Sequence, residues 1–268
     1  PTTLWVVAVD GQSARELAAP GDLVSGEDEP ILIGQVGWLD ESSLYFNTAR
    51  LQSLGLQRHD DLWRVNIDSG EVILLLSPGE GGAFSISPDR KQIAIIEPGL
   101  YGETDGQIRL LDTQTQDVRG SLSFAAVSTG AEYRFYPEVF WEMDNSAMRV
   151  ALPDKDLIYD DVDSLPVILW RLSSDGLTEQ IGSAPASFFG LPRWSSDGSY
   201  MTYLRRVGTA TSTEFELMIA DGSGENATRY TAGEAGTFGA PTWIPDSDQF
   251  IYPQGEPNEY WLGSTGAL

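Results

Sequence analysis

A short segment recurs five times along the chain and sets the scale of its folding unit. Each copy has an aromatic or apolar anchor, a short polar turn and a second apolar run. The copies are 36–46, 84–95, 139–150, 192–203 and 241–252, with anchors at positions 38, 86, 141, 194 and 243. Successive anchors are 48, 55, 53 and 49 residues apart. This near-constant spacing indicates a structural repeat of roughly 50 residues.

A second kind of segment follows each copy, in which apolar residues alternate and end in an Asp, Ser or Gly turn. Examples are 62–70, 108–113, 168–176 and 217–222. Alternation with period two before such a turn is typical of a β-hairpin. Each repeat should therefore form four short antiparallel strands, and four-stranded blades repeated around an axis make a β-propeller. No stretch has a sustained 3.6-residue apolar period, so the predicted fold is all-β.

The ends of the chain leave the number of blades open. We expect a single propeller domain over 1–268, with repeats beginning near 36, 83, 138, 191 and 240. Residues 1–35 are expected to form the outer hairpin of a first blade and a linker, and 259–266 resemble a third strand with no fourth after it. Six blades with a reduced first blade are favoured. Five blades, with the N-terminal strand completing the last one, also fit.

Particular turns carry a resemblance to a known family. These are Trp-Ser-Ser-Asp-Gly at 194–198, Ile-Ser-Pro-Asp at 86–89 and the segment 220–231. They resemble TolB-type, WD40-like propeller repeats, and related repeats build the N-terminal propellers of prolyl-oligopeptidase-like enzymes. The resemblance covers most of 36–252 and is specific for fold rather than function. It implies an extracytoplasmic location, whether periplasmic, secreted or tethered to a surface.

The recurring residue types have physical explanations. Pro, Asp, Ser and Gly suit tight turns, and large flat side chains suit the gaps between blades. We therefore expect Trp38, Trp141, Trp194 and Trp243 to lie in the core between blades. The turn after Trp38 is one residue shorter than the others, and the turn at 142–144 has no Pro or Gly to support it.

Composition excludes several classes of function. Sixteen Lys and Arg against 40 Asp and Glu give a net charge of −24, which disfavours binding to nucleic acid or to anionic membranes. The chain has no cysteine, which rules out disulfides and thiolate sites, and one histidine, His59. Since no Gly-x-Ser-x-Gly elbow accompanies it, we interpret His59 as an exposed loop residue. No apolar run approaches the roughly 18 residues that span a bilayer.

One acidic loop is the candidate metal site. Asp154, Asp156, Asp160, Asp161 and Asp163 fall within ten residues, and Ca²⁺ binds six to eight oxygens from such clusters. The spacing is not that of an EF-hand, and the central glycine is missing. A solvated acidic loop is therefore the favoured interpretation, with Ca²⁺ as the alternative and no other cofactor expected.

We expect a non-catalytic binding or scaffolding protein, because a propeller presents loops and a channel mouth on a rigid frame. The longest connections, 49–61, 98–106, 128–137 and 154–164, are candidate contacts with a protein partner. Tyr133, Phe135 and Tyr136 are the candidate partner-binding residues, since loop aromatics are typical of interaction hot spots. A subunit of a larger surface assembly also fits. The alternative is a propeller enzyme, or a hydrolase's accessory propeller, with a carboxylate or metal site in the channel.

Overall fold

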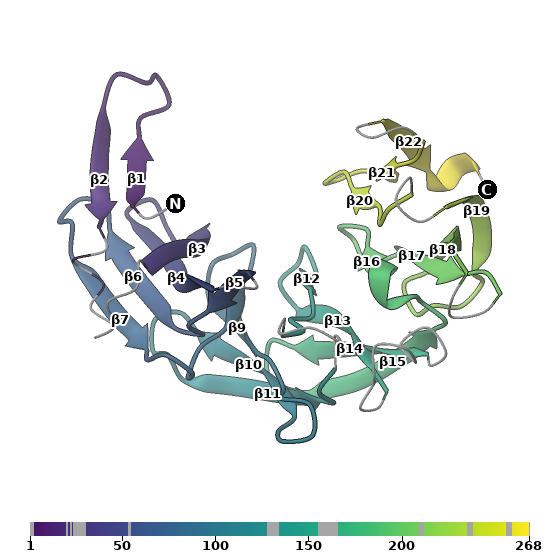
Figure 1. The fold of residues 1–268 in the computed structure, drawn as a ribbon, viewed down its shortest axis with the longest axis horizontal. Helices are drawn as coiled ribbons and strands as arrows, with labels where there is room; N and C mark the ends of the chain where they lie inside the picture. The colour runs from purple at the N-terminus through teal and green to yellow at the C-terminus, as the bar shows by residue number, and fades with distance from the viewer. Residues whose placement is uncertain are drawn as a thin grey trace. The chain divides into compact units, whose positions relative to one another are not determined.

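The computed structural model describes residues 3–19, 21, 23, 31–52, 55–127, 134–154, 166–208, 212–234, 238–255 and 259–267. These residues form six antiparallel sheets and the short 3-10 helices η3 (Phe188–Gly190) and η4 (Thr265–Ala267) (Figure 1). The all-β prediction is confirmed. Two compact units are present, unit 1 (1–98 and 107–118) and unit 2 (99–106 and 119–268). Among the described residues, no helix is long and apolar enough to cross a bilayer.

Unit 1 contains the first two sheets and most of the third. Sheet 1 is β1 (Leu4–Val7) paired with β2 (Ala14–Ala18). Sheet 2 has the order β3 (Ile31–Trp38), β4 (Ser43–Gln52), β6 (Leu62–Asn66) and β7 (Val72–Leu76), and β5 (Gly55–Arg58) pairs with the end of β4. Sheet 3 consists of β8 (Ala83–Ile86), β9 (Gln92–Glu97), β10 (Gly106–Asp112) and β11 (Val118–Phe124). The predicted connection at 49–61 is thus partly a β4–β5 hairpin.

Unit 2 contains three further sheets in sequence order (Figure 1). Sheet 4 is β12 (Val139–Trp141), β13 (Ala147–Pro153), β14 (Val167–Ser173) and β15 (Thr178–Ala184). Sheet 5 is β16 (Arg193–Trp194), β17 (Tyr200–Arg206), β18 (Glu214–Asp221) and β19 (Thr228–Glu234). Sheet 6 has three strands, β20 (Thr242–Trp243), β21 (Gln249–Pro253) and β22 (Tyr260–Ser264). The predicted four-stranded meander is confirmed in sheets 4 and 5.

In sheets 2 to 6, the first and second strands are joined by the short turns that the repeat predicted. In the 195–200 turn, the Ser195 hydroxyl donates to Asp197 at 2.7 Å and accepts the Tyr200 amide at 3.0 Å. Ser87 and Asp89 repeat the hydroxyl–carboxylate bond at 2.7 Å. The turns between third and fourth strands lie at the same ends of the sheets. We call these ends the turn side and the opposite ends the loop side.

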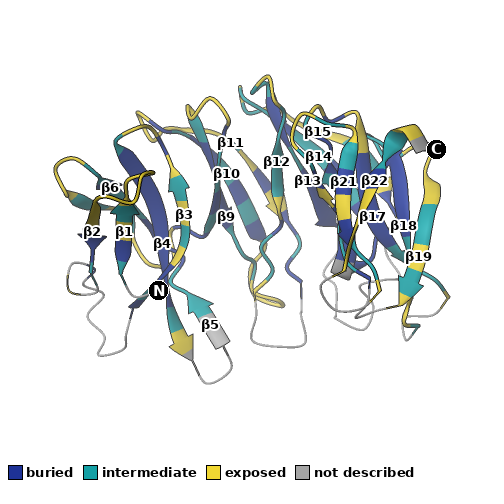
Figure 2. Cartoon of the chain, turned by 90° about the horizontal axis from the view of Figure 1, so that it is seen from above, coloured by how far each residue is buried: buried dark blue, intermediate teal, exposed yellow. Residues whose placement is uncertain are grey.

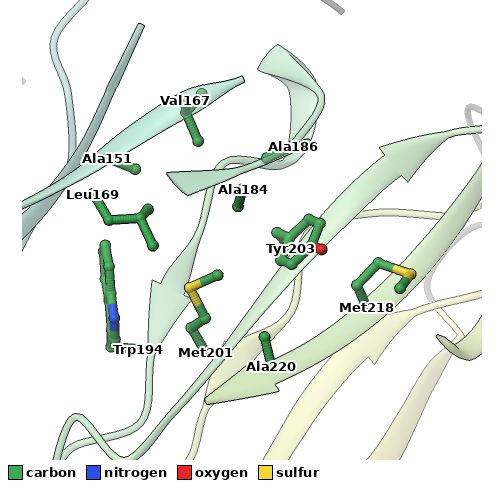
Figure 3. Close-up of a cluster of buried hydrophobic side chains, with 10 residues drawn as sticks. All are labelled: Ala151, Val167, Leu169, Ala184, Ala186, Trp194, Met201, Tyr203, Met218 and Ala220. Carbon is green, nitrogen blue, oxygen red and sulfur yellow. The ribbon is translucent and has the colours of Figure 1, made fainter. Parts of the chain in front are cut away.

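Apolar side chains between neighbouring sheets form the core of unit 2. Trp194 and Met201 of sheet 5 lie beside Leu169 of sheet 4 in one buried cluster (Figure 3). Phe140 of β12 meets Trp194 edge-on, with ring centroids 5.4 Å apart. Trp243 is 8% exposed and packs among residues of sheets 5 and 6. The predicted burial of Trp194 and Trp243 between blades is confirmed, and Trp141 is half-buried.

The predicted burial of Trp38 is wrong. Its side chain is 47% exposed, while the next residue, Leu39, is buried against Tyr45 and Phe84. The pairing of β3 with β4 shifts register between Ile33 and Val36. Because successive side chains of a strand point to opposite faces, such an irregularity changes which residues face the core.

Unit 1 is built on the same principle. One buried cluster joins sheets 1 and 2 through residues such as Leu17 and Phe46, and another joins sheets 2 and 3 through Tyr45 and Ile95. Polar ties add to the second contact, since the Asn47 amide donates to the Gly82 carbonyl at 2.8 Å. Figure 2 shows that buried residues concentrate in the strands, whereas the turns are largely exposed.

Glycines allow the turns of one sheet in unit 2 to touch the outer strand of the sheet before it. A Cβ atom built on Gly182 of β15 would lie 1.9 Å from the Ser223 carbonyl oxygen in the β18–β19 turn. A Cβ on Gly120 of β11 would lie 2.5 Å from the Cα of Gly176 in the β14–β15 turn. Both contacts place backbone directly on backbone, which a larger side chain would prevent.

Gly182→Ala should therefore destabilise the protein by about 2 kcal/mol, because the methyl group has no space without a backbone shift. Gly266→Ala is the matched control, since its nearest neighbour, Ser264 Oγ, lies 3.6 Å from the built Cβ. Urea unfolding of both variants measures the difference. Equal stability of the two variants would contradict this close contact.

Candidate functional site

A cavity of about 200 Å³ lies on the loop side of unit 2. It is lined by Tyr136, Glu138, Ala151, Phe188, Gly190, Leu191, Pro192, Arg193 and Ala240. We call it the Arg193 cavity. Its wall combines the apolar side chains of Phe188, Leu191 and Pro192 with the polar side chains of Arg193, Glu138 and Tyr136. A hollow that brings apolar surface and a few placed polar groups together is a common form of ligand site.

The guanidinium of Arg193 is held in place from three directions. Its Nε donates to Glu138 Oε2 at 3.0 Å. Its Nη1 donates to the Pro241 carbonyl at 3.1 Å and to Thr242 Oγ1 at 3.2 Å. The Arg193 carbonyl accepts the indole N–H of Trp243 at 2.9 Å. Arg193 thereby ties sheet 5 to sheet 6 and to the residue that precedes sheet 4.

The backbone before Arg193 is positioned by a 3-10 turn. The Ser187 amide donates to the Leu204 carbonyl at 2.7 Å, and the Gly190 amide closes the turn onto the Ser187 carbonyl at 2.9 Å. A Cβ on Gly190 would lie 2.4 Å from the Cβ of Leu204. Glycine at this position therefore lets η3 pack against β17, which places Leu191 and Pro192 in the cavity wall.

The structure separates the three predicted partner-binding aromatics. Tyr136 is half-buried and lines the Arg193 cavity. Phe135 is half-buried between two other rings, 6.2 Å from Phe124 and 5.3 Å from Phe188 between centroids. Tyr133 lies outside the described residues. Phe135 thus supports the wall of the cavity through Phe188, while Tyr136 reaches the cavity itself.

A second, more open hollow of about 680 Å³ lies on the turn side of unit 2. It is lined by Met143, Ser195, Ser196, Asp197, Tyr200, Asp246, Ser247, Asp248 and Gln249. Two of its carboxylates already accept bonds within the sheets, Asp197 from Ser199 at 2.7 Å and Asp248 from Ser264 at 3.1 Å. These bonds assign both carboxylates a structural role.

The predicted calcium loop is only partly within the described structure. Asp154 is exposed at the end of β13, whereas Asp156, Asp160, Asp161 and Asp163 lie outside the described residues. Elsewhere in the described chain, no three His, Asp or Glu side chains gather closely enough to hold a metal ion. The Ca²⁺ interpretation therefore stays a prediction.

His59 is not the exposed loop residue that the sequence suggested. It is half-buried, and its Nδ1 lies 2.7 Å from Thr48 Oγ1. The Thr48 hydroxyl donates to Asp61, which also accepts the Trp63 indole N–H at 2.8 Å. Because the one hydroxyl proton of Thr48 goes to Asp61, His59 donates to Thr48. The group ties β4, β6 and their connection together in unit 1.

Several described carboxyl groups have pKa values below the ordinary range. Hydrogen bonds from neighbouring Ser side chains and backbone amides lower the pKa of Asp197, and Arg205 lowers that of Glu216. The others with lowered pKa values are Asp40, Glu142, Asp144, Asp175 and Asp221. None of these seven carboxyl groups has the raised pKa that a general acid needs near neutral pH.

Glu142 forms the strongest of these arrangements, in the 142–146 turn that lacks Pro and Gly. Its Oε1 accepts Arg149 Nε at 2.9 Å and Arg171 Nε at 3.0 Å. Its Oε2 accepts Arg171 Nη2 and the Ser146 hydroxyl, both at 2.8 Å. The bonds from Arg171 and Ser146 lower the Glu142 pKa from 4.5 to about 2, against a smaller opposing effect of burial. Ion pairs thus replace the missing turn residues.

Glu142→Gln should destabilise the protein by about 2–3 kcal/mol at pH 7, because it leaves two partly buried arginines without their carboxylate. Since the folded pKa lies below 4.5, the carboxylate's stabilisation is complete above pH 4.5 and is lost as the pH falls towards 2. Urea unfolding at pH 7 and pH 3 checks this, because the difference in unfolding free energy between wild type and variant should be smaller at pH 3. Glu103→Gln, at an exposed position, is the control. A difference in unfolding free energy that does not depend on pH would contradict the role of the ionised Glu142.

Sequence reasoning missed Arg193 and Glu138, although a signal was available. Arg193 directly precedes the anchor Trp194, and the equivalent residues of the other copies are Gly37, Ser85, Phe140 and Thr242. A charged residue at this one position, on a two-residue strand, marks a departure from the repeat. The partners of the guanidinium could not be read from the repeat, because they lie 48 to 55 residues away.

Comparisons with known proteins support the fold. No protein-family profile and no curated protein matches the chain. The chain is similar to oligogalacturonate lyase in complex with manganese (TM-score 0.57, 14% identity, covering 98% of this chain and 68% of the lyase). It is also similar to the β-propeller domain of the trilobed protease from Pyrococcus furiosus (TM-score 0.56, 12% identity, 88% and 69%). A chain of the nidogen/laminin complex matches with a TM-score of 0.50 and 8% identity over 95% and 81%.

The chain therefore has the β-propeller fold, built from antiparallel blades. The neighbours agree with the resemblance to TolB-type and WD40-like repeats at the level of the fold. At identities of 8–14% they carry no information on activity. The predicted preference for six blades over five stays a prediction.

Proposed function

We propose that this propeller is a non-catalytic binding module that holds a protein partner through its loops and channel mouth. The observation that carries the proposal is the Arg193 cavity, where rigid sheets present a fixed guanidinium beside Tyr136. Aromatic and arginine side chains are the residues most enriched at interaction hot spots. A guanidinium that is already held in place lowers the entropic cost of binding.

The ionised state of the shifted carboxyl groups also supports binding rather than catalysis. Each of the lowered pKa values has a local cause in a turn or an ion pair, as for Glu142 and Asp197. Groups held ionised by such bonds stabilise hairpins and cannot supply a proton near neutral pH. The similar chain in the nidogen/laminin complex is a further point of support, since that complex joins two proteins.

A second candidate function is a propeller enzyme, or the accessory propeller of one. The specific observation in its favour is the similarity to oligogalacturonate lyase in complex with manganese and to the propeller domain of a protease. Mn²⁺ or Ca²⁺ that raised the melting temperature of this chain would favour this candidate.

The proposed setting follows from charge and resemblance. A net charge of −24 favours a partner with a basic surface and disfavours nucleic acid. On the strength of the TolB-type resemblance, we propose that the protein acts outside the cytoplasm, free or as a subunit of a surface assembly.

Tyr136→Ala should reduce capture of the partner from a native extract at least about tenfold, because it removes an aromatic contact at the loop-side cavity. Tyr200→Ala is the matched control, since Tyr200 is 40% exposed at the turn-side hollow. Quantitative pull-downs with wild type and both variants provide the measurement. Loss of the partner with Tyr200→Ala alone would place binding on the opposite side and defeat the proposal.

A further inference from the structure

Among the described residues, part of the hydrogen-bonding capacity of Arg193 has no partner. Its Nε and both Nη1 hydrogens are engaged by Glu138, Pro241 and Thr242. No hydrogen bond from its Nη2 to the described residues is present, and the side chain is 30% exposed. The acceptors that hold Nε and Nη1 keep the orientation of the whole planar group fixed. Within the described structure, the two N–H groups of Nη2 on this prepositioned guanidinium are therefore left for a ligand.

The charge of the guanidinium favours a carboxylate. The remaining N–H donors both belong to Nη2 and diverge, so a carboxylate binds through one oxygen, and the charge makes this hydrogen bond stronger than a neutral one. A neutral carbonyl carries no charge, so it gains less from the same donor. The polar part of the expected ligand is therefore a carboxylate.

The rest of the cavity specifies what the carboxylate is attached to. The walls beside Arg193 are the side chains of Phe188, Leu191 and Pro192 with Ala151 and Ala240. The volume of about 200 Å³ is below the roughly 300–1,000 Å³ of pockets that enclose drug-sized molecules. The space therefore suits one small apolar side chain next to the carboxylate.

Glu138 limits how strongly an anion binds here. Its carboxylate is 57% exposed and pairs with Arg193 through Oε2. A ligand carboxylate on Nη2 would lie near that negative charge and would compete with it. Charges further away on this acidic chain matter less, because salt screens them beyond about 8 Å.

We propose that the Arg193 cavity binds a carboxylate that stands next to a small apolar side chain, as at the C-terminus of a polypeptide. This inference rests on the proposed function and names the chemistry that its loop side recognises. The same chemistry is offered by an acidic side chain within a peptide, next to an apolar residue.

Isothermal titration with three short peptides separates these sources. The first is an N-acetylated tripeptide that ends in valine with a free carboxylate, the second is its C-terminal amide, and the third is an amide with an internal Glu before the valine. We expect the free acid to bind at least about tenfold more tightly than the first amide. Preference for the third peptide would assign an internal acidic residue. Equal binding of all three, or no binding up to about 10 mM, would overturn the proposal.

Two variants test the assignment to Arg193. Arg193→Lys keeps the charge but loses the planar group whose Nε and Nη1 hold Nη2 in place, and it should weaken binding of the free acid at least about fivefold. Glu138→Gln removes the competing charge and should strengthen binding about threefold or more. Weaker binding of the free acid by Glu138→Gln would contradict the inference, because it would show that the Glu138 charge does not compete with the ligand. Tyr200→Ala should bind like wild type, and melting temperatures confirm that each variant is folded.

The outcomes also separate this inference from the proposed function. If Tyr136→Ala loses the protein partner while no peptide binds, the ligand chemistry is wrong and the binding module stands. If the free acid binds but Tyr136→Ala captures the protein partner as well as wild type does, the cavity is a carboxylate site unrelated to the partner, and the proposed function fails.

Discussion

The structure depends on apolar contact between the faces of successive sheets. A sheet of four short strands cannot exclude water from both faces by itself, so each sheet gains stability only against a neighbour. In unit 2 this contact is made by Trp194 and Met201 of one sheet against Leu169 of another. The glycine contacts at Gly182 and Gly176 let the turns of one sheet lie as close to the neighbouring sheet as the apolar faces do. Side-chain size at these few positions thus sets how near the sheets lie.

The acidic composition takes on a structural meaning in this setting. Many of the carboxylates are the acceptors of tight turns, as Asp197 is for Ser195 and Ser199, and Asp221 is for the Ser223 amide at 3.1 Å. Each such bond satisfies backbone or hydroxyl donors that a short turn would otherwise leave unpaired. Part of the acidic composition is therefore a consequence of a fold with many hairpins, and does not by itself indicate catalysis or metal binding.

The hairpins could be predicted from local sequence patterns. The burial of particular side chains and the cavity could not, because they depend on long-range geometry. Period-two alternation before an Asp-Gly or Ser-Gly turn depends only on neighbouring residues, so the hairpins that begin at 168–176 and 217–222 could be predicted. The exposure of Trp38 could not, because a register shift within β3 changes the faces of the residues after it. The half-burial of His59 depends on Thr48, which joins it from the neighbouring strand. The Arg193 cavity required residues from three sheets.

Arg193 illustrates how one side chain serves both the frame and a site. Its bonds to Pro241 and Thr242 join two sheets, and this role alone would account for an arginine at this position. A purely structural arginine, however, gains from using all of its donors and from closing its surroundings. Here Nη2 has no acceptor among the described residues, and Arg193 lines a cavity. The bonds that fix the sheets are thus also the bonds that prepare the guanidinium for a ligand. Binding and stability at this position are therefore coupled, because any change that frees the guanidinium also loosens the contact between sheets 5 and 6.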